Sequence, residues 1–456
     1  MISRSPLTLL ALLPLVAVQL ACGLATGTAT PTPAAPPSDA TATPTAATPP
    51  TQTPEAPLTP TVAPPTNTPE PTATAAPVGP SCEVAYTRTG QLYCRADDGN
   101  EILLTAVDGG SLQGAALSSD GTLVAYIIGV PDGPADLFAI SVAQAQAGDL
   151  TPTALANDTN LTGANPDDMV SARVIAFVPG TQTLLFDTRY VPAGGIVGPG
   201  EYQNNDLWRV NVDGTGLAQI APAGTAGRFA ISPTGGHVAL SSGNTISVLD
   251  LAASSITPAL EFDPILTYSE YAYKPEANWA PDGSGFTVAV PSVDPMAEDT
   301  HATLHRITTA GIEEPLGLVP GNFVFGGVLS LSPLGDRVAY GVRDAAGQMD
   351  SITVRRLPDD PGPGGANLPE ILWLDWSADG TRLAIGHRNV VNNAQILEPD
   401  GSLRSLDLPV VEIVWRATDV YYLVANGDGS FDVDVLRPSG VQVLATALPS
   451  TLWAVR

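Results

Sequence analysis

The sequence predicts an all-β protein folded as a β-propeller, a ring of four-stranded antiparallel blades. Three observations lead to this fold class. A hairpin pattern recurs along the chain: a strand, a tight turn containing Gly, and a second strand of alternating apolar residues. In the six clearest copies the turn glycines follow one another at intervals of 45 to 59 residues, which suits a four-stranded blade. The end of the chain repeats the first strand of a blade with nothing after it.

Residues 1–22 are predicted to be an export signal. Arg4 precedes an apolar run from Leu7 to Leu20, shorter than the ~20 unbroken apolar residues that a membrane span needs. The run leads into Cys22 and resembles the signal of bacterial lipoproteins. That resemblance implies lipidation of Cys22 and a place at the cell membrane or envelope, facing outside the cytoplasm. The alternative is an ordinary secretory signal with an incidental cysteine.

Residues 23–80 consist almost entirely of Thr, Pro and Ala, and we expect them to form a disordered stalk. No periodic apolar positions occur there, so no core can form, and frequent proline favours an extended chain. At about 3 Å per residue, such a stalk would reach more than ~100 Å. The alternative is simple disordered filler.

Residues 81–456 carry nearly all of the net charge of −27, since only four charged side chains precede them: Arg4, Asp39, Glu55 and Glu70. A surface this acidic repels nucleic acid and anionic lipid headgroups. We therefore exclude a nucleic-acid partner.

The hairpin copies assign this whole region to one ring. Six clear copies begin at Leu117, Val178, Ile231, Trp279, Leu331 and Trp376, and a degenerate seventh begins at Val414. Residues 84–105 match a second, third and fourth strand, whereas 448–456 match a first strand. We therefore expect the last strand to join the first blade and close the ring. Seven copies and this shared blade give eight blades of about 47 residues. Seven blades are the alternative, if one copy is an irregular insertion.

Cys82 and Cys94 flank one hairpin of the first blade. In an oxidising compartment we expect a disulfide between them, with a three-residue loop around Arg88 placing them opposite each other; two free thiols are the alternative. No CxxC motif or Cys/His cluster accompanies them, so no metal or cofactor is expected. His301 and His305 lie about 13 Å apart on the predicted strand, too far to share a metal.

The Ser-Pro-Asp-Gly-like hairpins, followed by the segment Leu-Trp-Arg-Val-Asn-Val-Asp-Gly-Thr-Gly at residues 207–216, resemble TolB-type β-propeller repeats. The resemblance spans residues 81–456 and implies a scaffold without catalytic residues. The α/β domain that precedes the propeller in TolB has no counterpart here. Related propellers serve as binding platforms, and some precede a hydrolase domain that this sequence lacks.

Loop lengths predict where a ligand binds. Four antiparallel strands place the first-to-second and third-to-fourth turns on one face of the ring, here called the short-turn face, where all the short Asp-Gly turns are expected. The second-to-third and blade-to-blade connections lie on the other, the long-loop face. The long segments all fall on this second face: Ala156–Met169, Tyr190–Asn205, Phe262–Lys274, Pro291–Thr300 and Pro358–Ala366. Insertions confined to one face are typical of a binding surface.

Tyrosines interleaved with carboxylates in these loops suit recognition of carbohydrate or peptide by stacking and hydrogen bonding. The candidate ligand-binding residues are Tyr190, Tyr202, Tyr268, Tyr271, Tyr273, Glu201, Glu270 and Asp294. The alternative is that the tyrosines only pack the loops against the ring.

The sequence thus predicts an extracytoplasmic, lipid-anchored β-propeller that binds or scaffolds an envelope protein or glycan through its long-loop face. No nucleophile elbow, Walker loop or Rossmann motif is present, which favours a protein that is not an enzyme. The alternative is a hydrolase or lyase acting on envelope or extracellular polymers, which needs two or three converging carboxylates or a metal. A further alternative is an assembly spacer without a small ligand.

Overall fold

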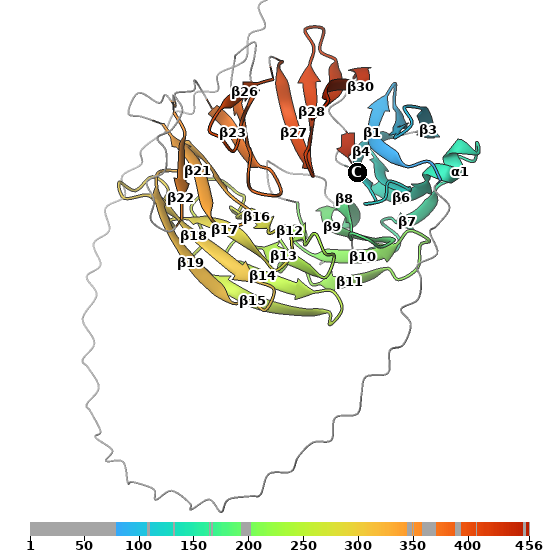
Figure 1. Ribbon diagram of the computed structural model, residues 1–456. Coiled ribbons are helices and arrows are strands. Elements are labelled where there is room, and N and C mark those ends of the chain that lie inside the picture. Colours follow the sequence, from blue (N-terminus) through green and yellow to red (C-terminus); the bar gives the residue numbers. More distant parts are fainter. Residues whose placement is uncertain are drawn as a thin grey trace, which may run out of the picture. The chain divides into compact units, whose positions relative to one another are not determined.

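The computed structural model describes residues 79–106, 110–130, 133–163, 165, 167–192, 202–343, 349, 351–357, 371–387, 394–406, 408–449 and 453–455. The predicted signal, Cys22 and the predicted stalk lie outside these ranges, apart from residues 79 and 80. The described residues belong to one compact unit. Its sheets form the eight blades of a β-propeller, as the repeats predict (Figure 1).

Each blade is an antiparallel sheet in which neighbours in the chain are paired. Blade 1 contains β31 (Trp453–Val455), β1 (Cys82–Arg88), β2 (Gln91–Ala96) and β3 (Glu101–Ala106). Blade 2 contains β4 (Ser111–Leu117), β5 (Leu123–Gly129), β6 (Ala135–Ser141) and β7 (Thr153–Ala156). Blade 3 contains β8 (Met169–Phe177), β9 (Thr183–Val191), β10 (Leu207–Asn211) and β11 (Ala218–Ala221). Blade 4 contains β12 (Arg228–Ile231), β13 (His237–Ser241), β14 (Thr245–Asp250) and β15 (Ser255–Glu261).

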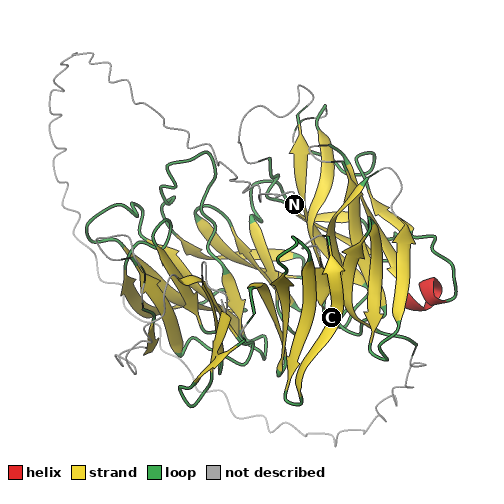
Figure 2. Cartoon of the chain, turned by 90° about the horizontal axis from the view of Figure 1, so that it is seen from above, coloured by secondary structure: helices red, strands yellow, loops and turns green. Residues whose placement is uncertain are grey.

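Blade 5 contains β16 (Ala277–Trp279), β17 (Gly285–Pro291), β18 (His301–Thr308) and β19 (Glu313–Pro320). In blade 6 the structure describes three strands, β20 (Gly327–Leu331), β21 (Arg337–Val342) and β22 (Thr353–Arg356). Blade 7 contains β23 (Ile371–Trp376), β24 (Leu383–His387), β25 (Ala394–Leu397) and β26 (Leu403–Ser405). Blade 8 contains β27 (Val410–Arg416), β28 (Asp419–Ala425), β29 (Phe431–Arg437) and β30 (Gly440–Leu448). The helix α1 (Val142–Gln146) lies between β6 and β7, and Figure 2 shows it beside sheets that make up the rest of the unit.

In several copies of the recurring hairpin, the hydroxyl of a buried serine stabilises the turn by hydrogen bonds. In the turn between β23 and β24, the Ser377 hydroxyl donates to Asp379 Oδ1 at 2.6 Å and accepts from the Arg382 N–H at 2.9 Å. Gly380 takes the positive φ of +66° that the turn requires. Burial of Asp379 would raise its pKa, but the hydrogen bonds from Ser377 and Thr381 outweigh burial and lower it. The Ser-x-Asp-Gly pattern therefore stabilises this turn, although the same turn also forms with Ala280 in place of the serine.

The hydrophobic core is divided into eight clusters, and each cluster joins two successive blades. Strand β28 shows why the sequence supports this arrangement. Tyr421 and Leu423 pack towards blade 1, whereas Val420, Tyr422 and Val424 pack towards blade 7. Since side chains alternate along a strand, an uninterrupted apolar run serves two interfaces.

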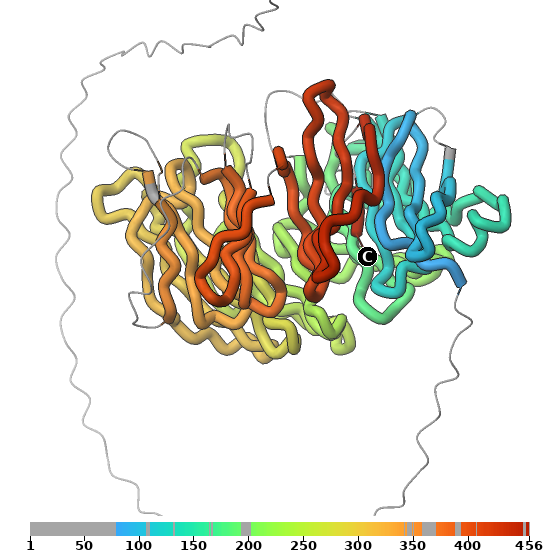
Figure 3. The backbone as a smooth tube through the Cα atoms, turned by 45° about the horizontal axis from the view of Figure 1, so that its top comes forward, coloured from blue at the N-terminus to red at the C-terminus, as the bar shows by residue number. Residues whose placement is uncertain are grey.

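The ring closes through the last strand, as the sequence predicts. Strand β31 pairs with β1, with Trp453 opposite Tyr86 and Val455 opposite Val84. In Figure 3 the last strands of the chain lie beside the first ones. The Trp453 indole N–H also donates to Glu412 on blade 8 at 2.7 Å. This pairing covers the edge of β1 that would otherwise be exposed.

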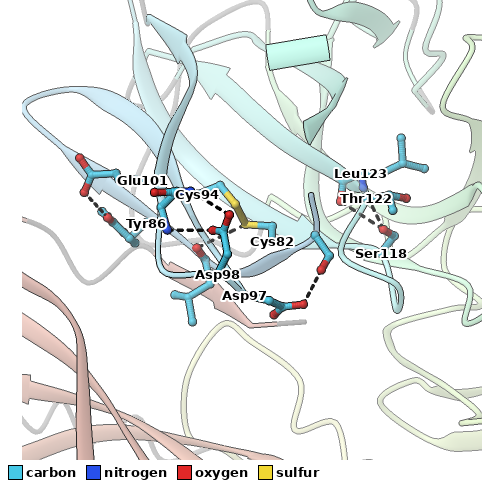
Figure 4. Close-up of a disulfide and its surroundings, with 12 residues drawn as sticks. Cys82, Tyr86, Cys94, Asp97, Asp98, Glu101, Ser118, Thr122 and Leu123 are labelled. Atoms are coloured by element: carbon cyan, nitrogen blue, oxygen red, sulfur yellow. Dashed lines mark hydrogen bonds between the residues drawn. A yellow bond between two sulfur atoms is a disulfide. The ribbon is translucent and has the colours of Figure 1, made fainter. Parts of the chain in front are cut away.

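Cys82 and Cys94 form a disulfide, with their Cα atoms 5.6 Å apart (Figure 4). The expected loop around Arg88 is wrong: β1 and β2 meet in a two-residue turn, Thr89 and Gly90, in which both residues have positive φ. Cys94 accordingly pairs with Ala85, and an irregularity of the ladder after Cys82 brings the two cysteines together. A two-residue turn of this kind matches the twist of the strands better than a longer loop.

The strands follow the predicted order, so their connections lie on the two faces of the ring as predicted. Two connections differ from what the sequence predicts for their face. Asp428 and Gly429 connect β28 to β29 on the long-loop face, so the expectation that all Asp-Gly turns occupy the short-turn face is wrong. The helix α1 adds a longer connection to the short-turn face. The predicted long segment Pro358–Ala366 lies outside the described residues. Among the described residues, none forms a helix long and apolar enough to cross a membrane.

Candidate functional site

The structure divides the predicted tyrosines into two groups on the long-loop face. Tyr190 and Tyr202 contact each other edge to face, with ring centroids 5.7 Å apart. Tyr190 also packs against the core between blades 2 and 3, which is the packing role that the sequence left open. Tyr268 and Tyr271 belong to the connection between blades 4 and 5, and both are exposed. The predicted Glu201 lies outside the described residues.

Exposed apolar side chains gather around Tyr268. The Tyr268 hydroxyl donates to Asp294 Oδ1 at 3.0 Å, and its ring lies 6.2 Å from the ring of Phe325. Asp294 also accepts the Met296 N–H at 2.8 Å, which fixes the β17–β18 loop. Glu270 is exposed beside this group and accepts from Ser269.

We call this surface the aromatic patch. It comes from three loops that are consecutive around the ring: the connection from blade 4 to blade 5, the β17–β18 loop, and the connection from blade 5 to blade 6. The backbone N–H of Leu266 donates to the Val293 carbonyl at 2.8 Å, which joins the first two loops. The six exposed residues of the patch are Leu266, Tyr268, Tyr271, Val293, Met296 and Phe325.

The same three loops line a cavity of about 210 Å³ near the first strands of blades 4 to 7, here called the channel cavity. Three residues of the patch each have a neighbour two positions away that lines the cavity. Tyr273, Pro291 and Phe323 line the cavity, and their counterparts in the patch are Tyr271, Val293 and Phe325. The patch and the channel cavity are therefore neighbouring parts of one surface.

Tyr273, predicted as an exposed contact residue, is half-buried in the channel cavity, where burial raises the pKa of its hydroxyl. It packs against the core between blades 4 and 5. Its role is to line the cavity, and it does not take part in the exposed patch. Tyr271 and Tyr273 flank Ala272, and the loop, which is not a regular strand there, leaves Tyr271 exposed and Tyr273 half-buried.

The charged groups of the channel cavity lie on the first strands of the blades or a few residues before them. Arg228 on β12 donates to Glu276 Oε1 at 2.6 Å, and both side chains are exposed. Asp375 on β23 lines the same cavity. Burial, followed by the negative charge of Glu276, raises the pKa of Asp375 to about 7. Two carboxylates with different environments thus share one cavity.

Lys274 lies between the two groups of tyrosines and is not among the residues predicted from the sequence. Its ammonium donates to Gln203 Oε1 at 2.9 Å and to Asn205 Oδ1 at 2.7 Å, although these residues precede it by about 70 positions. One signal was present in the sequence: Lys274 is the sole lysine of the chain, and it lies in a loop already predicted to bind. No such signal marks Arg228, Glu276 or Asp375 in the sequence, because each lies just before a copy of the recurring hairpin and outside its pattern.

Within the described residues, no group of three or more His, Cys, Asp or Glu side chains is arranged to hold a metal ion. His301 and His305 both lie on β18, as predicted. The His305 ring contacts Glu313 Oε1 at 2.7 Å and Thr303 Oγ1 at 2.9 Å. These partners give His305 a structural role on the sheet.

Comparisons with known proteins found similar solved structures and no matching family. No family model matches the sequence, and no curated protein is similar to it. Among solved structures, the chain is similar to a eukaryotic initiation factor, with 12% identity, coverage of 80% of this chain and 85% of that one, and a TM-score of 0.48. It is also similar to TolB from Acinetobacter baumannii, with 12% identity, 63% and 82% coverage and a TM-score of 0.34. An acylaminoacyl peptidase from Pyrococcus horikoshii gives 15% identity, 60% and 45% coverage and a TM-score of 0.43.

Proposed function

We propose that this protein is a β-propeller binding protein that recognises a partner protein or glycan through the aromatic patch of its long-loop face. The observation that carries the proposal is the patch itself. Tyr268 is 66% exposed and Met296 is 65% exposed, the Tyr268 ring contacts that of Phe325, and three more exposed apolar side chains lie in the same loops. Contiguous exposed apolar side chains of this kind are typical of interaction sites.

The loops of the patch are held in place, which suits a preformed binding surface. Asp294 accepts hydrogen bonds from Tyr268 and from the Met296 backbone, and the Thr267 hydroxyl donates to the Tyr271 carbonyl at 2.7 Å. A surface ordered before binding loses less conformational entropy when the partner arrives. Aromatic residues supply large contact areas at low entropic cost.

Alanine substitutions in the patch test this proposal. Partners are first identified by applying the purified full chain to a glycan array and to an extract of cell-envelope proteins. A variant with Tyr268→Ala and Phe325→Ala should then bind each confirmed partner at least about 10-fold more weakly, since central aromatic contacts carry much of the binding energy of an interface.

Ile312 provides the matched control. It is 64% exposed and lies in the β18–β19 turn on the short-turn face of the same blade. Ile312→Ala should leave the affinity unchanged. Equal affinities of the patch variant and the Ile312→Ala variant would contradict the assignment of the site.

The location is part of the same proposal. We infer an exported protein, anchored in the membrane through lipidated Cys22 and held away from it by residues 23–80. The signal-like run before Cys22 and the Thr/Pro composition support this. Cys22→Ser should move the protein from the membrane fraction to the soluble extracytoplasmic fraction. A variant that stays in the membrane fraction would contradict the lipid anchor.

A hydrolase or lyase acting on envelope or extracellular polymers is the second candidate, and the carboxylates of the channel cavity favour it. A carboxyl with a pKa of about 7, such as Asp375, is suited to act as a general acid near neutral pH, with Glu276 nearby as a carboxylate. Incubation of the full chain with envelope polysaccharides and analysis of the products tests this. Cleavage that Asp375→Asn abolishes would establish the enzyme, whereas cleavage that survives it would exclude this site.

A further inference from the structure

A second cavity, of about 520 Å³, lies beside the channel cavity, with which it shares Arg228 and Lys274. We call it the cationic cavity. Blade 3 contributes Arg173, Asp187 and Gln203, blade 4 contributes Arg228 and Phe229, and the connection from blade 4 to blade 5 contributes Lys274. Three cationic side chains therefore meet one carboxylate there.

This concentration of positive charge contrasts with the rest of the molecule. The whole chain has 19 Lys and Arg against 46 Asp and Glu, and it has one lysine, which lines this cavity. Arg228 also pairs with Glu276, so with Asp187 and Glu276 ionised the three cationic side chains exceed the carboxylates by one. Clefts lined by one sign of charge concentrate ligands of the opposite sign, even on a protein of opposite net charge.

Arg173 reaches the cavity because the strand is irregular at that point. The pairing of β8 with β9 shifts between Ala172 and Ile175, which is the signature of a bulge. The freed Val174 N–H donates to Asp187 Oδ1 at 2.8 Å, and the Arg173 guanidinium pairs with the same carboxylate. Asp187 is 1% exposed and holds Arg173 in place through this ion pair, while the Arg173 side chain as a whole remains about one-third exposed.

Lys274 is also positioned by its surroundings. Gln203 and Asn205 accept from its ammonium and hold it at the border of the two cavities. The amide groups of Gln203 in the cationic cavity and of Asn278 in the channel cavity offer donors and acceptors that suit hydroxyl groups of a ligand. The rings of Phe229 and Tyr273 line the two cavities and provide apolar faces.

We propose that the cationic cavity binds the carboxylate of an acidic saccharide unit, whose ring then occupies the channel cavity. This inference rests on the proposed function, because it names the chemical class that the long-loop face recognises. Cations paired with carboxylate, amides paired with hydroxyl groups and aromatic faces paired with C–H groups form a complementary set. A highly acidic polypeptide or polyanion is disfavoured by the net charge of −27, whereas a sugar with one carboxylate meets little long-range repulsion.

The sole lysine makes a direct test possible. The full chain labelled with ¹³C-lysine gives a single set of lysine side-chain NMR signals, which report on Lys274. Glucuronate should shift the Lys274 Cε signal in a saturable way, and glucose, which has the same ring without the carboxylate, should not. No shift with glucuronate up to tens of millimolar, on folded protein, would overturn the proposal.

Three variants and a second anion test the proposed carboxylate site further. Arg228→Met should weaken glucuronate binding about 10- to 100-fold, because one charge-assisted hydrogen bond is lost. Arg209→Met, which removes an exposed positive charge on β10 outside the cavity, should not change it. Lys274→Arg keeps the charge and should retain binding by calorimetry if Lys274 acts as a cation. Equal shifts with glucuronate and N-acetylglutamate would overturn the preference for a saccharide.

These outcomes separate the two proposals. A saturable shift with glucuronate, together with patch variants that bind every partner normally, would support the carboxylate site and contradict the proposed role of the patch. Loss of partner binding in the patch variants, with no response of Lys274 to glucuronate, would contradict the carboxylate site alone.

Discussion

Replacing Trp453 by alanine tests whether the last strand holds the ring closed. Trp453 lies on β31, where it pairs with Tyr86 of β1 and is 9% exposed. It belongs to the cluster that joins blade 8 to blade 1, and its indole N–H donates to Glu412. The side chain therefore joins the closing strand to the core between blades 8 and 1 and, through the hydrogen bond, to Glu412 of blade 8.

The expected loss of stability follows from these contacts. Truncation of a buried tryptophan costs about 3–5 kcal/mol, from lost burial and from the cavity that remains. The hydrogen bond to Glu412 forms part of this loss, and Trp453→Phe isolates it. Because Glu412 is exposed and water can replace the indole, we expect Trp453→Phe to cost about 1–2 kcal/mol.

Urea unfolding of the full chain, followed by far-ultraviolet circular dichroism at 25 °C, measures these differences. Val443 on β30 of blade 8 is 51% exposed, and Val443→Ala should change the free energy of unfolding by no more than about 0.5 kcal/mol. If Trp453→Ala lowered it no more than Val443→Ala does, the closing strand would contribute little, and our account of ring closure would be refuted.

Three further predictions concern the scaffold. Burial, followed by a neighbouring carboxylate, raises the pKa of Asp434 to about 6, so the stabilisation present at low pH is lost as the pH rises through 6. Asp434→Asn should therefore stabilise the protein by up to about 3 kcal/mol at pH 8 and by about half as much at pH 5, measured by urea unfolding at each pH; equal effects would contradict the pKa shift. Joint replacement of Cys82 and Cys94 by Ser should cost about 2–4 kcal/mol, and wild type in reducing agent should match the variant. Ser377→Ala should lower thermal stability by about 1–3 kcal/mol, because a buried N–H loses its acceptor, whereas Ser402→Ala in an exposed turn should cost less; equal melting temperatures would show that the buried hydroxyl is dispensable.

The repeats allowed the fold to be predicted because turn chemistry is local. The turn glycine has a positive φ in all six clear copies, so it is visible in each, and an Asp that accepts a turn N–H, such as Asp379, is present in three of them. The tryptophans that end several first strands follow from contacts between blades. Trp376 donates its indole N–H to the Ser330 carbonyl of blade 6, and Trp279 donates to the Ala230 carbonyl of blade 4. A tryptophan at this position therefore indicates the end of a first strand and its contact with the first strand of the preceding blade.

The candidate site was harder to predict, since it depends on which residues of different blades meet. Arg173 lines a cavity because of a bulge that no turn residue announces. Lys274 and Gln203 are 71 positions apart and meet only because the connection from blade 4 to blade 5 lies beside the β9–β10 loop of blade 3. Tyr271 and Tyr273 look equivalent in the sequence, yet the path of the loop gives one to the patch and the other to the channel cavity. Loop lengths were enough to predict which face of the ring holds the candidate site. The direction of each side chain could be seen only in the structure.

The disulfide has a mechanical consequence at the entrance to the propeller. Cys82 is the first residue of β1, and β1 lies between β2 and β31 in its sheet. If the preceding segment acts as a tether, any pulling force enters the folded unit at this residue. The covalent bond to Cys94 passes the load directly to β2, and the cross-strand hydrogen bonds of both neighbours then resist it together. Oxidation of the two thiols would thus determine whether blade 1 withstands tension or peels from the ring.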